Sequence, residues 1–106
     1  MENETEILVV GTNEKILQVV LRLLRANVLW RATGVSGVDE VLSGCREKVY
    51  DVLLIGAGLT DEEEERLSTE VKTIRPAIKV IKHYGGGSGL LFAEIYLALG
   101  TKNQAQ

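Results

Sequence analysis

Two short segments of uncharged residues, Gly11–Asn13 and Gly56–Gly58, lie where an α/β protein would place its functional groups. Each follows an apolar run, Ile7–Val10 in the first case and Tyr50–Ile55 in the second. Backbone amides at the start of a helix can bind an anion, although Thr12 or Asn13 can equally serve only to cap the helix. Neither segment offers a carboxylate for Mg²⁺ or a nucleophile for covalent catalysis. The candidate ligand-binding residues here are Gly11, Thr12, Asn13, Gly56 and Gly58.

Other reactive side chains are few, and each has a structural explanation. His83 and Tyr84 precede a glycine-rich stretch, 85–89, which lacks the lysine of a nucleotide-binding P-loop, so we expect a flexible connection there. Cys45 lies on the apolar side of a helix, where packing is its expected role. One histidine and one cysteine cannot build a zinc site. We predict no catalytic residue, no metal and no cofactor, and keep His83 and Tyr84 as candidate ligand-binding residues.

Composition excludes several classes of partner. The 12 basic and 15 acidic residues give a net charge of −3, which does not favour nucleic acid. No apolar run is long enough to cross a bilayer, so no membrane partner is expected. A single cysteine fits a reducing compartment, and the segment Met1–Glu4 lacks the features of a signal peptide. These observations predict a cytoplasmic protein.

The elements that must position the candidate residues alternate between strand and helix. In the first helix, from Asn13 to about Asn27, we expect a buried stripe of Ile16, Val20, Leu23 and Leu24. Ser36 is expected to cap the second helix, and Thr60 with Glu63 to form a capping box at the third. The acidic residues 62–65 are interpreted as a solvated helix start. The predicted strands cover 7–10, 29–35, 50–55 and 78–81, and a last helix covers 90–99.

This order predicts an α/β fold of the flavodoxin-like, three-layer αβα type with a shortened parallel sheet. The two wholly apolar strands belong in the centre, which gives the strand order 2-1-3-4. Ligands in such sheets bind beyond the carboxyl ends of the strands at the switch point, here between the first and third strands. We expect a single domain over 1–106, with an ordered core at about 6–100 and a polar tail at 101–106.

Three segments resemble the receiver domain of bacterial response regulators. Ile7–Leu17 resembles the opening of that domain, Asp51–Gly56 its phosphoacceptor strand, and Ile74–Ile81 the run into its fourth strand. The resemblance covers about residues 6–85. It implies a role in two-component or related signal transduction.

The functional positions of receivers are replaced in this chain. Gly11 and Thr12 stand where the resemblance implies a pair of metal-binding acids, Gly56 where it implies the phosphoacceptor aspartate, and Tyr84 where it implies a serine or threonine. The later lysine of receivers has no counterpart. The chain therefore resembles a degenerate receiver, or pseudo-receiver, without phosphorylation chemistry.

The last helix, Leu90–Leu99, carries one charged residue, Glu94. Leu91, Ile95 and Leu99 can cover the sheet, which leaves other apolar side chains facing outward for self-association, unless the short sheet wraps the helix more completely. The missing fifth strand exposes a strand edge, where lysines either prevent pairing or take part in a dimer. Whether 89–92 forms a vestigial strand stays open. The candidate interface residues are Lys79, Lys82, Leu90, Phe92, Tyr96 and Leu97.

The sequence thus predicts a receiver-like signalling module that binds protein, most directly a second copy of itself, and that is not an enzyme. A homodimer through the fourth strand and last helix is the expected assembly, and a signalling partner protein is conceivable. The alternative is a small-molecule or nucleotide-binding domain that uses the glycine-lined pocket at the switch point.

Overall fold

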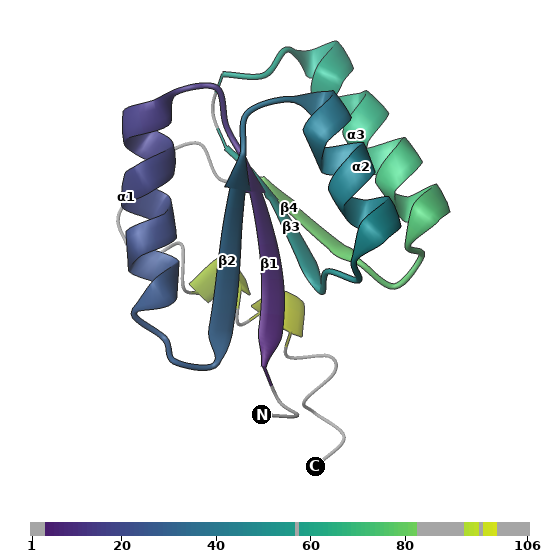
Figure 1. Cartoon of the computed structure of the whole chain (residues 1–106). Coiled ribbons are helices and arrows are strands. Elements are labelled where there is room, and N and C mark those ends of the chain that lie inside the picture. The colour runs from purple at the N-terminus through teal and green to yellow at the C-terminus, as the bar shows by residue number, and fades with distance from the viewer. Residues whose placement is uncertain (1–3, 57, 83–92, 96, 100–106) are drawn as a thin grey trace.

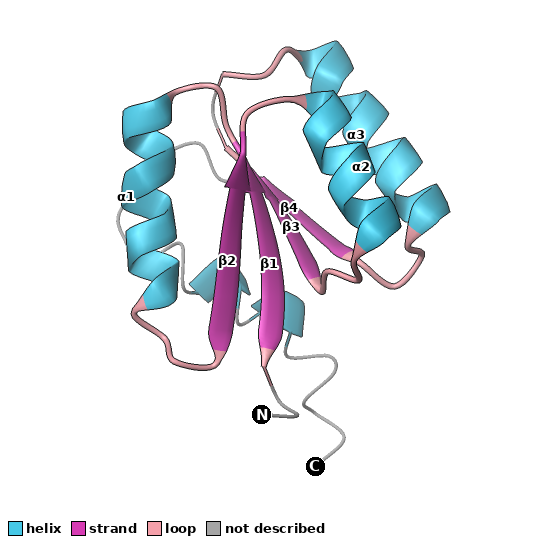
Figure 2. Ribbon diagram, viewed as in Figure 1, coloured by secondary structure: helices cyan, strands magenta, loops and turns pink. Residues whose placement is uncertain are grey.

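The computed structural model describes residues 4–56, 58–82, 93–95 and 97–99. A central sheet has helices on both faces, with α1 on one side and the neighbouring helices α2 and α3 on the other (Figures 1 and 2). The elements in chain order are β1 (Thr5–Val10), α1 (Glu14–Arg25), β2 (Trp30–Val35), α2 (Val38–Glu47), β3 (Val52–Ile55), α3 (Asp61–Ile74) and β4 (Lys79–Lys82).

Within the described residues the sheet has four parallel strands in the order β2-β1-β3-β4, as the sequence predicts. The central strands β1 and β3 supply the runs Ile7–Val10 and Val52–Ile55, and all of these side chains are buried. The outer strands carry charged residues, because a strand with one neighbour keeps part of its surface in water. The predicted three-layer αβα fold is confirmed.

Each face of the sheet has its own hydrophobic core. Alternate residues of a strand point to opposite faces, so Ile7 and Val9 join the core under α1, while Leu8 and Val10 join the core under α2 and α3. The α1 side is completed by Ile95 and Leu99, which are 0% and 5% exposed. The last helix therefore covers the same face as α1.

The buried stripe of α1 differs from the predicted one. Leu17, Leu21 and Leu24 are buried, whereas Ile16 is 51% exposed and Val20 and Leu23 are only partly buried. Apolar residues occupy more than one face of this helix, so the sequence is compatible with several rotations about the helix axis. Packing against β1 and β2 selects one of them.

The helix starts agree with the sequence in two cases and differ in one. Asn13 caps α1 through its side chain, and Thr60 with Glu63 forms the predicted capping box of α3. At α2 the N-cap is Gly37, not the predicted Ser36, and Gly37 has no side chain with which to cap. Ser36 instead donates from its amide and its hydroxyl to Glu40 Oε1, at 2.7 and 3.1 Å.

Strand boundaries shift by one or two residues. β1 begins at Thr5, β3 begins only at Val52, and β4 spans Lys79–Lys82. Tyr50 is buried without belonging to the strand, because its ring packs in the core under α2 and α3. An apolar run predicts that its residues are buried, but it does not fix the residue at which the strand begins.

The last predicted helix is described at 93–95 and 97–99, and these residues are helical. Ile95 and Leu99 face the sheet as expected, and Leu97 points outward with 78% of its surface exposed. The predicted sheet-facing residue Leu91, the predicted outward residues Leu90, Phe92 and Tyr96, and the tail 101–106 lie outside the described residues.

Candidate functional site

The loops after β1 and β3 meet at the carboxyl edge of the sheet, where the sequence places the switch point. Gly11 N donates to Val35 O at 3.1 Å, and Gly56 N donates to Val10 O at 2.8 Å. The backbone of Gly56 also approaches β1 closely, since a Cβ at this position would lie 3.2 Å from Val10 O. A residue with a side chain at position 56 would therefore crowd the end of β1.

Gly58 and Thr12 are in direct contact across this edge. Gly58 has φ +106°, a conformation that residues with a Cβ rarely adopt, and a Cβ there would collide with Thr12 Oγ1. The threonine side chain thus occupies the space that a side chain at position 58 would take. Four of the five predicted ligand-binding glycine-loop residues converge on one uncharged patch: Gly11, Thr12, Gly56 and Gly58.

Asn13, the fifth, has a structural role in this structure. Its Oδ1 accepts a hydrogen bond from Ile16 N at 3.1 Å, which caps the first turn of α1. For Asn13 the structure therefore shows helix capping, which the sequence offers as the alternative to ligand binding. His83 and Tyr84 lie outside the described residues.

Acidic side chains do occur near the carboxyl edge, at the starts of the helices, and three of them accept hydrogen bonds from nearby residues. Glu14 accepts from Gln18 at 2.9 Å, and Glu63 accepts from the amide of Thr60 at 2.9 Å. Hydrogen bonds from the amide and hydroxyl of Ser36 lower the pKa of Glu40. These carboxylates stabilise helix starts and are not directed at the patch around Gly56.

Glu64 corrects the interpretation of the acidic run as a wholly solvated helix start. It is 6% exposed, and its Oε1 lies 3.5 Å from Lys82 Nζ. Glu64 precedes the buried residues Leu67 and Val71 by three and seven positions, so it continues their stripe on α3. Lys82 forms this ion pair with half of its side chain still exposed, so its predicted roles, guarding the strand edge or entering an interface, stay predictions.

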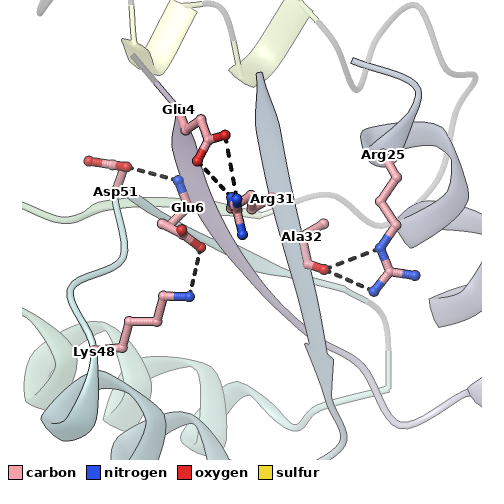
Figure 3. Close-up of polar contacts among 7 residues, drawn as sticks. All are labelled: Glu4, Glu6, Arg25, Arg31, Ala32, Lys48 and Asp51. Atoms are coloured by element: carbon pink, nitrogen blue, oxygen red, sulfur yellow. Dashed lines mark hydrogen bonds and ion pairs between the residues drawn. The ribbon is translucent and has the colours of Figure 1, made fainter. Parts of the chain in front are cut away.

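The amino edge of the sheet carries a denser set of polar contacts (Figure 3). Arg31 Nε lies 2.7 Å from Glu4 Oε1, and Lys48 Nζ lies 3.1 Å from Glu6 Oε1. The hydrogen bond from Arg31 lowers the pKa of Glu4. Asp51, at the start of β3, accepts from Glu6 N at 2.9 Å. Asp51 therefore links β1 to the start of β3, at the end of the sheet opposite to the switch point.

Two further arginines tie helices to neighbouring backbone. Arg25, at the end of α1, donates to Ala32 O at 2.9 Å, and Arg75 donates to Cys45 O at 2.9 Å. Cys45 is fully buried, as predicted, and its burial raises the pKa of the thiol. A protonated, buried thiol is a poor nucleophile, so Cys45 acts in packing.

Within 4–56, 58–82, 93–95 and 97–99, no three His, Cys, Asp or Glu side chains are grouped so as to hold a metal ion. No helix in the same part of the chain is long and apolar enough to span a bilayer.

Comparison by sequence finds no matching protein family and no matching curated protein. Comparison of structures does find neighbours. A BeF3-activated DrrB receiver domain matches with a TM-score of 0.77 and 18% identity, over 92% of this chain and 98% of that one. A CheY-like response regulator receiver domain protein from Methanospirillum hungatei JF-1 matches with a TM-score of 0.69 and 21% identity, over 90% of this chain and 75% of that one.

A third neighbour, described as a phosphate-loop protein, matches with a TM-score of 0.60 and 16% identity over 95% of this chain and 93% of its own. At these identities the likeness concerns the fold. The protein has the fold of response regulator receiver domains, which belongs to the flavodoxin-like class. A fold shared with a phosphate-loop protein does not by itself decide the activity.

Proposed function

We propose that this protein is a pseudo-receiver: a signalling module with the receiver fold that binds protein and is not phosphorylated on aspartate. The observation that supports the proposal is the carboxyl edge of β1 and β3, where the chain has Gly11, Thr12 and Gly56 and the resemblance to receivers implies acids. Acyl phosphate formation needs a carboxylate nucleophile, and Mg²⁺ needs oxygen ligands of the same kind. Gly56 lacks the first, and Gly11 and Thr12 lack the second.

The test of this proposal is exposure to a small phosphoryl donor with Mg²⁺, followed by intact-mass measurement and amide NMR. A phosphorylatable receiver domain serves as the positive control for the donor. We expect no gain of a phosphoryl group and no Mg²⁺-dependent shifts at Gly11, Thr12 or Gly56. A mass gain of one phosphoryl group, or saturable Mg²⁺ shifts at these residues, would overturn the proposal.

The mode of action that we propose is self-association through β4 and the last helix, as a homodimer. Among the described strands β4 is the outer one on its side of the sheet, and its residues Lys79, Val80 and Ile81 are only half-buried. Leu97 adds a large exposed apolar side chain, 78% exposed, on the last helix. Burial of such a side chain favours association by about 2 kcal/mol before the costs of binding. Leu90, Phe92 and Tyr96 belong to this proposed interface on the sequence pattern alone.

Light scattering after gel filtration tests the proposed dimer. We expect a dimer in the high micromolar range that Leu97→Glu weakens. Val28→Glu is the matched control, because Val28 is 88% exposed and lies in the loop before β2, at the opposite edge strand. A wild-type chain that stays monomeric, or equal loss with both variants, would overturn the homodimer.

The setting that we propose is cytoplasmic, with 1–106 acting as one domain beside a separate output or signalling partner. Support comes from the single buried cysteine and from the one sheet whose two cores include both β1 and the last helix. Limited proteolysis tests the domain assignment. Protection of the region from β1 to Leu99 as one fragment is expected, and cleavage into two stable fragments would contradict it.

The alternative, a small-molecule or nucleotide-binding domain, is favoured by one observation: the loops at Gly11, Thr12, Gly56 and Gly58 converge and are uncharged. Thermal-shift measurements with nucleotides and flavins distinguish the two functions. A rise in melting temperature with one ligand that Thr12→Val abolishes would favour the alternative. No rise with any of them would leave the pseudo-receiver as the better function.

A further inference from the structure

A groove at the amino edge of the sheet carries an excess of positive charge. It has a volume of about 450 Å³ and lies between the loop before β3 and the end of α3. Its cationic lining residues are Lys72, Arg75 and Lys79, and its one acidic residue is Asp51. Asp51 already accepts the hydrogen bond from Glu6 N. The groove is therefore suited to an anionic occupant.

Two of the three cations in the groove are available to that occupant. Arg75 is held by its hydrogen bonds to Cys45 O and Arg46 O, at 2.9 and 3.5 Å. Neither Lys72 nor Lys79 forms an ion pair with any residue that the structure describes. Their ammonium groups flank the groove from α3 and from β4.

The groove also has apolar walls, so it can hold more than a free anion. Val49 is 61% exposed, and Pro76 and Ala77 are exposed in the loop between α3 and β4. Exposed apolar surface beside unpaired lysines fits an acidic segment of a folded protein better than a small free anion. The body of such a segment covers the walls, and its carboxylates approach the lysines.

The opposite end of α3 supplies such a segment. Asp61, Glu62 and Glu65 are exposed in its first turns, and among the described residues none of them has an ion-pair partner. Glu63 and Glu64 are already used by the capping box and by Lys82. One end of α3 is thus a free acidic surface, and the other end borders the free basic groove.

We infer that the acidic start of α3 in one copy docks into the basic groove of a second copy, in a head-to-tail contact. Helices α2 and α3 run side by side from the carboxyl edge to the amino edge (Figure 1), so the complementary surfaces lie at opposite ends of the molecule. A 14-residue helix is about 21 Å long, which separates the two surfaces too far for them to meet within one chain. The contact is heterologous and can propagate beyond a dimer. It differs from the proposed homodimer, which joins β4 and the last helix of two copies, although Lys79 belongs to both surfaces.

Charge reversal at residues outside the proposed homodimer interface separates the two contacts. Variant one is Lys72→Glu in the groove, which leaves Lys79 of β4 unchanged, and variant two is Glu62→Lys/Glu65→Lys on α3, which keeps the capping residue Glu63. Lys15→Glu is the matched control for variant one, because Lys15 is exposed on α1 and the change in net charge is the same. Circular dichroism melting confirms that each variant is folded.

Sedimentation at low salt and at 0.5 M NaCl measures the contact, since salt screens charges that lie at the surface. For the wild type and the α1 control we expect a weight-average mass that rises with concentration at low salt more than at high salt. Each groove or α3 variant alone should associate several-fold more weakly, which corresponds to the loss of one or two exposed ion pairs. An equimolar mixture of the two variants should regain association, because the acidic start of one fits the groove of the other.

Three outcomes would overturn the inference. The first is salt-independent association that both variants retain, which leaves the homodimer as the assembly. The second is an equimolar mixture that associates no more than either variant alone. The third is binding of a synthetic acidic peptide in the groove without any salt-dependent self-association, which would assign the groove to an acidic partner protein.

Discussion

The two edges of the sheet use charge in opposite ways. At the amino edge, Glu6, Asp51 and Lys48 join neighbouring strands and helices through hydrogen bonds and ion pairs of 2.9 to 3.1 Å. At the carboxyl edge, the loops after β1 and β3 meet through backbone hydrogen bonds and through the contact between Thr12 and Gly58. The parallel strands bring loops together at both edges, and among the described residues the ionisable groups at the centre of an edge are those of the amino edge.

The difference between the edges bears on function because this fold places its ligands at one of the two edges. Switch-point chemistry in a doubly wound sheet belongs to the carboxyl edge, because the strand ends and helix starts converge there. In this protein the residues at that position satisfy backbone geometry. Glu14 and Glu40, at two of the helix starts, accept hydrogen bonds from Gln18 of α1 and from Ser36 just before α2.

The largest expected effect concerns the close contact at the carboxyl edge. Gly58→Ala should lower the free energy of unfolding by about 3 kcal/mol, because it combines a positive φ with a collision against Thr12. Urea unfolding measures the loss, and Thr12→Ala in the same chain should restore part of it. Gly44→Ala is the control, since a Cβ there meets only ordinary contacts at 3.8 Å in a helix, and it should be neutral or stabilising. Equal losses at positions 58 and 44 would contradict this account of the edge.

The next effect tests the amino edge. Asp51→Ala should cost about 1 to 2 kcal/mol, since it leaves the part-buried amide of Glu6 without its acceptor. Asp51→Asn keeps an acceptor and should lose less, as measured by the same urea unfolding. A loss with Asn as large as the loss with Ala would show that the charge, rather than the hydrogen bond, is what joins the strands.

A smaller effect is expected at the start of α1. Asn13→Ala removes the acceptor for Ile16 N and should cost about 1 kcal/mol, whereas Asn13→Asp should be close to neutral. Chemical denaturation of the two variants measures the difference. If Asn13→Ala left stability unchanged but abolished binding of a nucleotide or flavin, the capping role would be secondary and the ligand-binding alternative would gain support.

The smallest effect is a dependence of stability on pH through Glu40. Hydrogen bonds from Ser36 lower the pKa of Glu40 in the folded protein below its ordinary value of 4.5. The stabilisation is therefore present above that value and is lost as the pH falls through the lowered folded-state pKa. Thermal melts taken from neutral pH to below pH 4.5 should show a smaller loss for Glu40→Gln than for the wild type. A larger loss for the variant would reverse the sign of this linkage.

Much of the fold follows from local pattern. Alternation of apolar strands with amphipathic helices predicts the parallel sheet, and the two wholly apolar runs identify the central strands, because only those are covered on both faces. The capping box of Thr60 and Glu63 is equally local, as it depends on residues three apart. The order of residues along the chain also predicts that Asp51 lies at the start of its strand, away from the switch point.

Other features depend on which distant surfaces meet. Ile16 looks apolar enough to be buried, yet the rotation of α1 against the sheet leaves it exposed. Glu64 looks like part of a solvated acidic run, yet the position of α3 over β4 buries it beside Lys82. Ser36 has the side chain of a capping residue, but the path of the chain into α2 places Gly37 at the cap.

By itself the sequence determined the order and type of the elements, the central strands, and the lack of acids after β1 and β3, because these depend on residue type and on spacing of a few positions. Only the tertiary structure decided that Thr12 fills the space at Gly58, that Glu64 pairs with Lys82, and that α3 has a free acid surface at one end and a basic groove at the other. The physical reason is that contacts between residues far apart in the chain are set by how helices rotate and pack on the sheet, and local pattern does not encode that rotation.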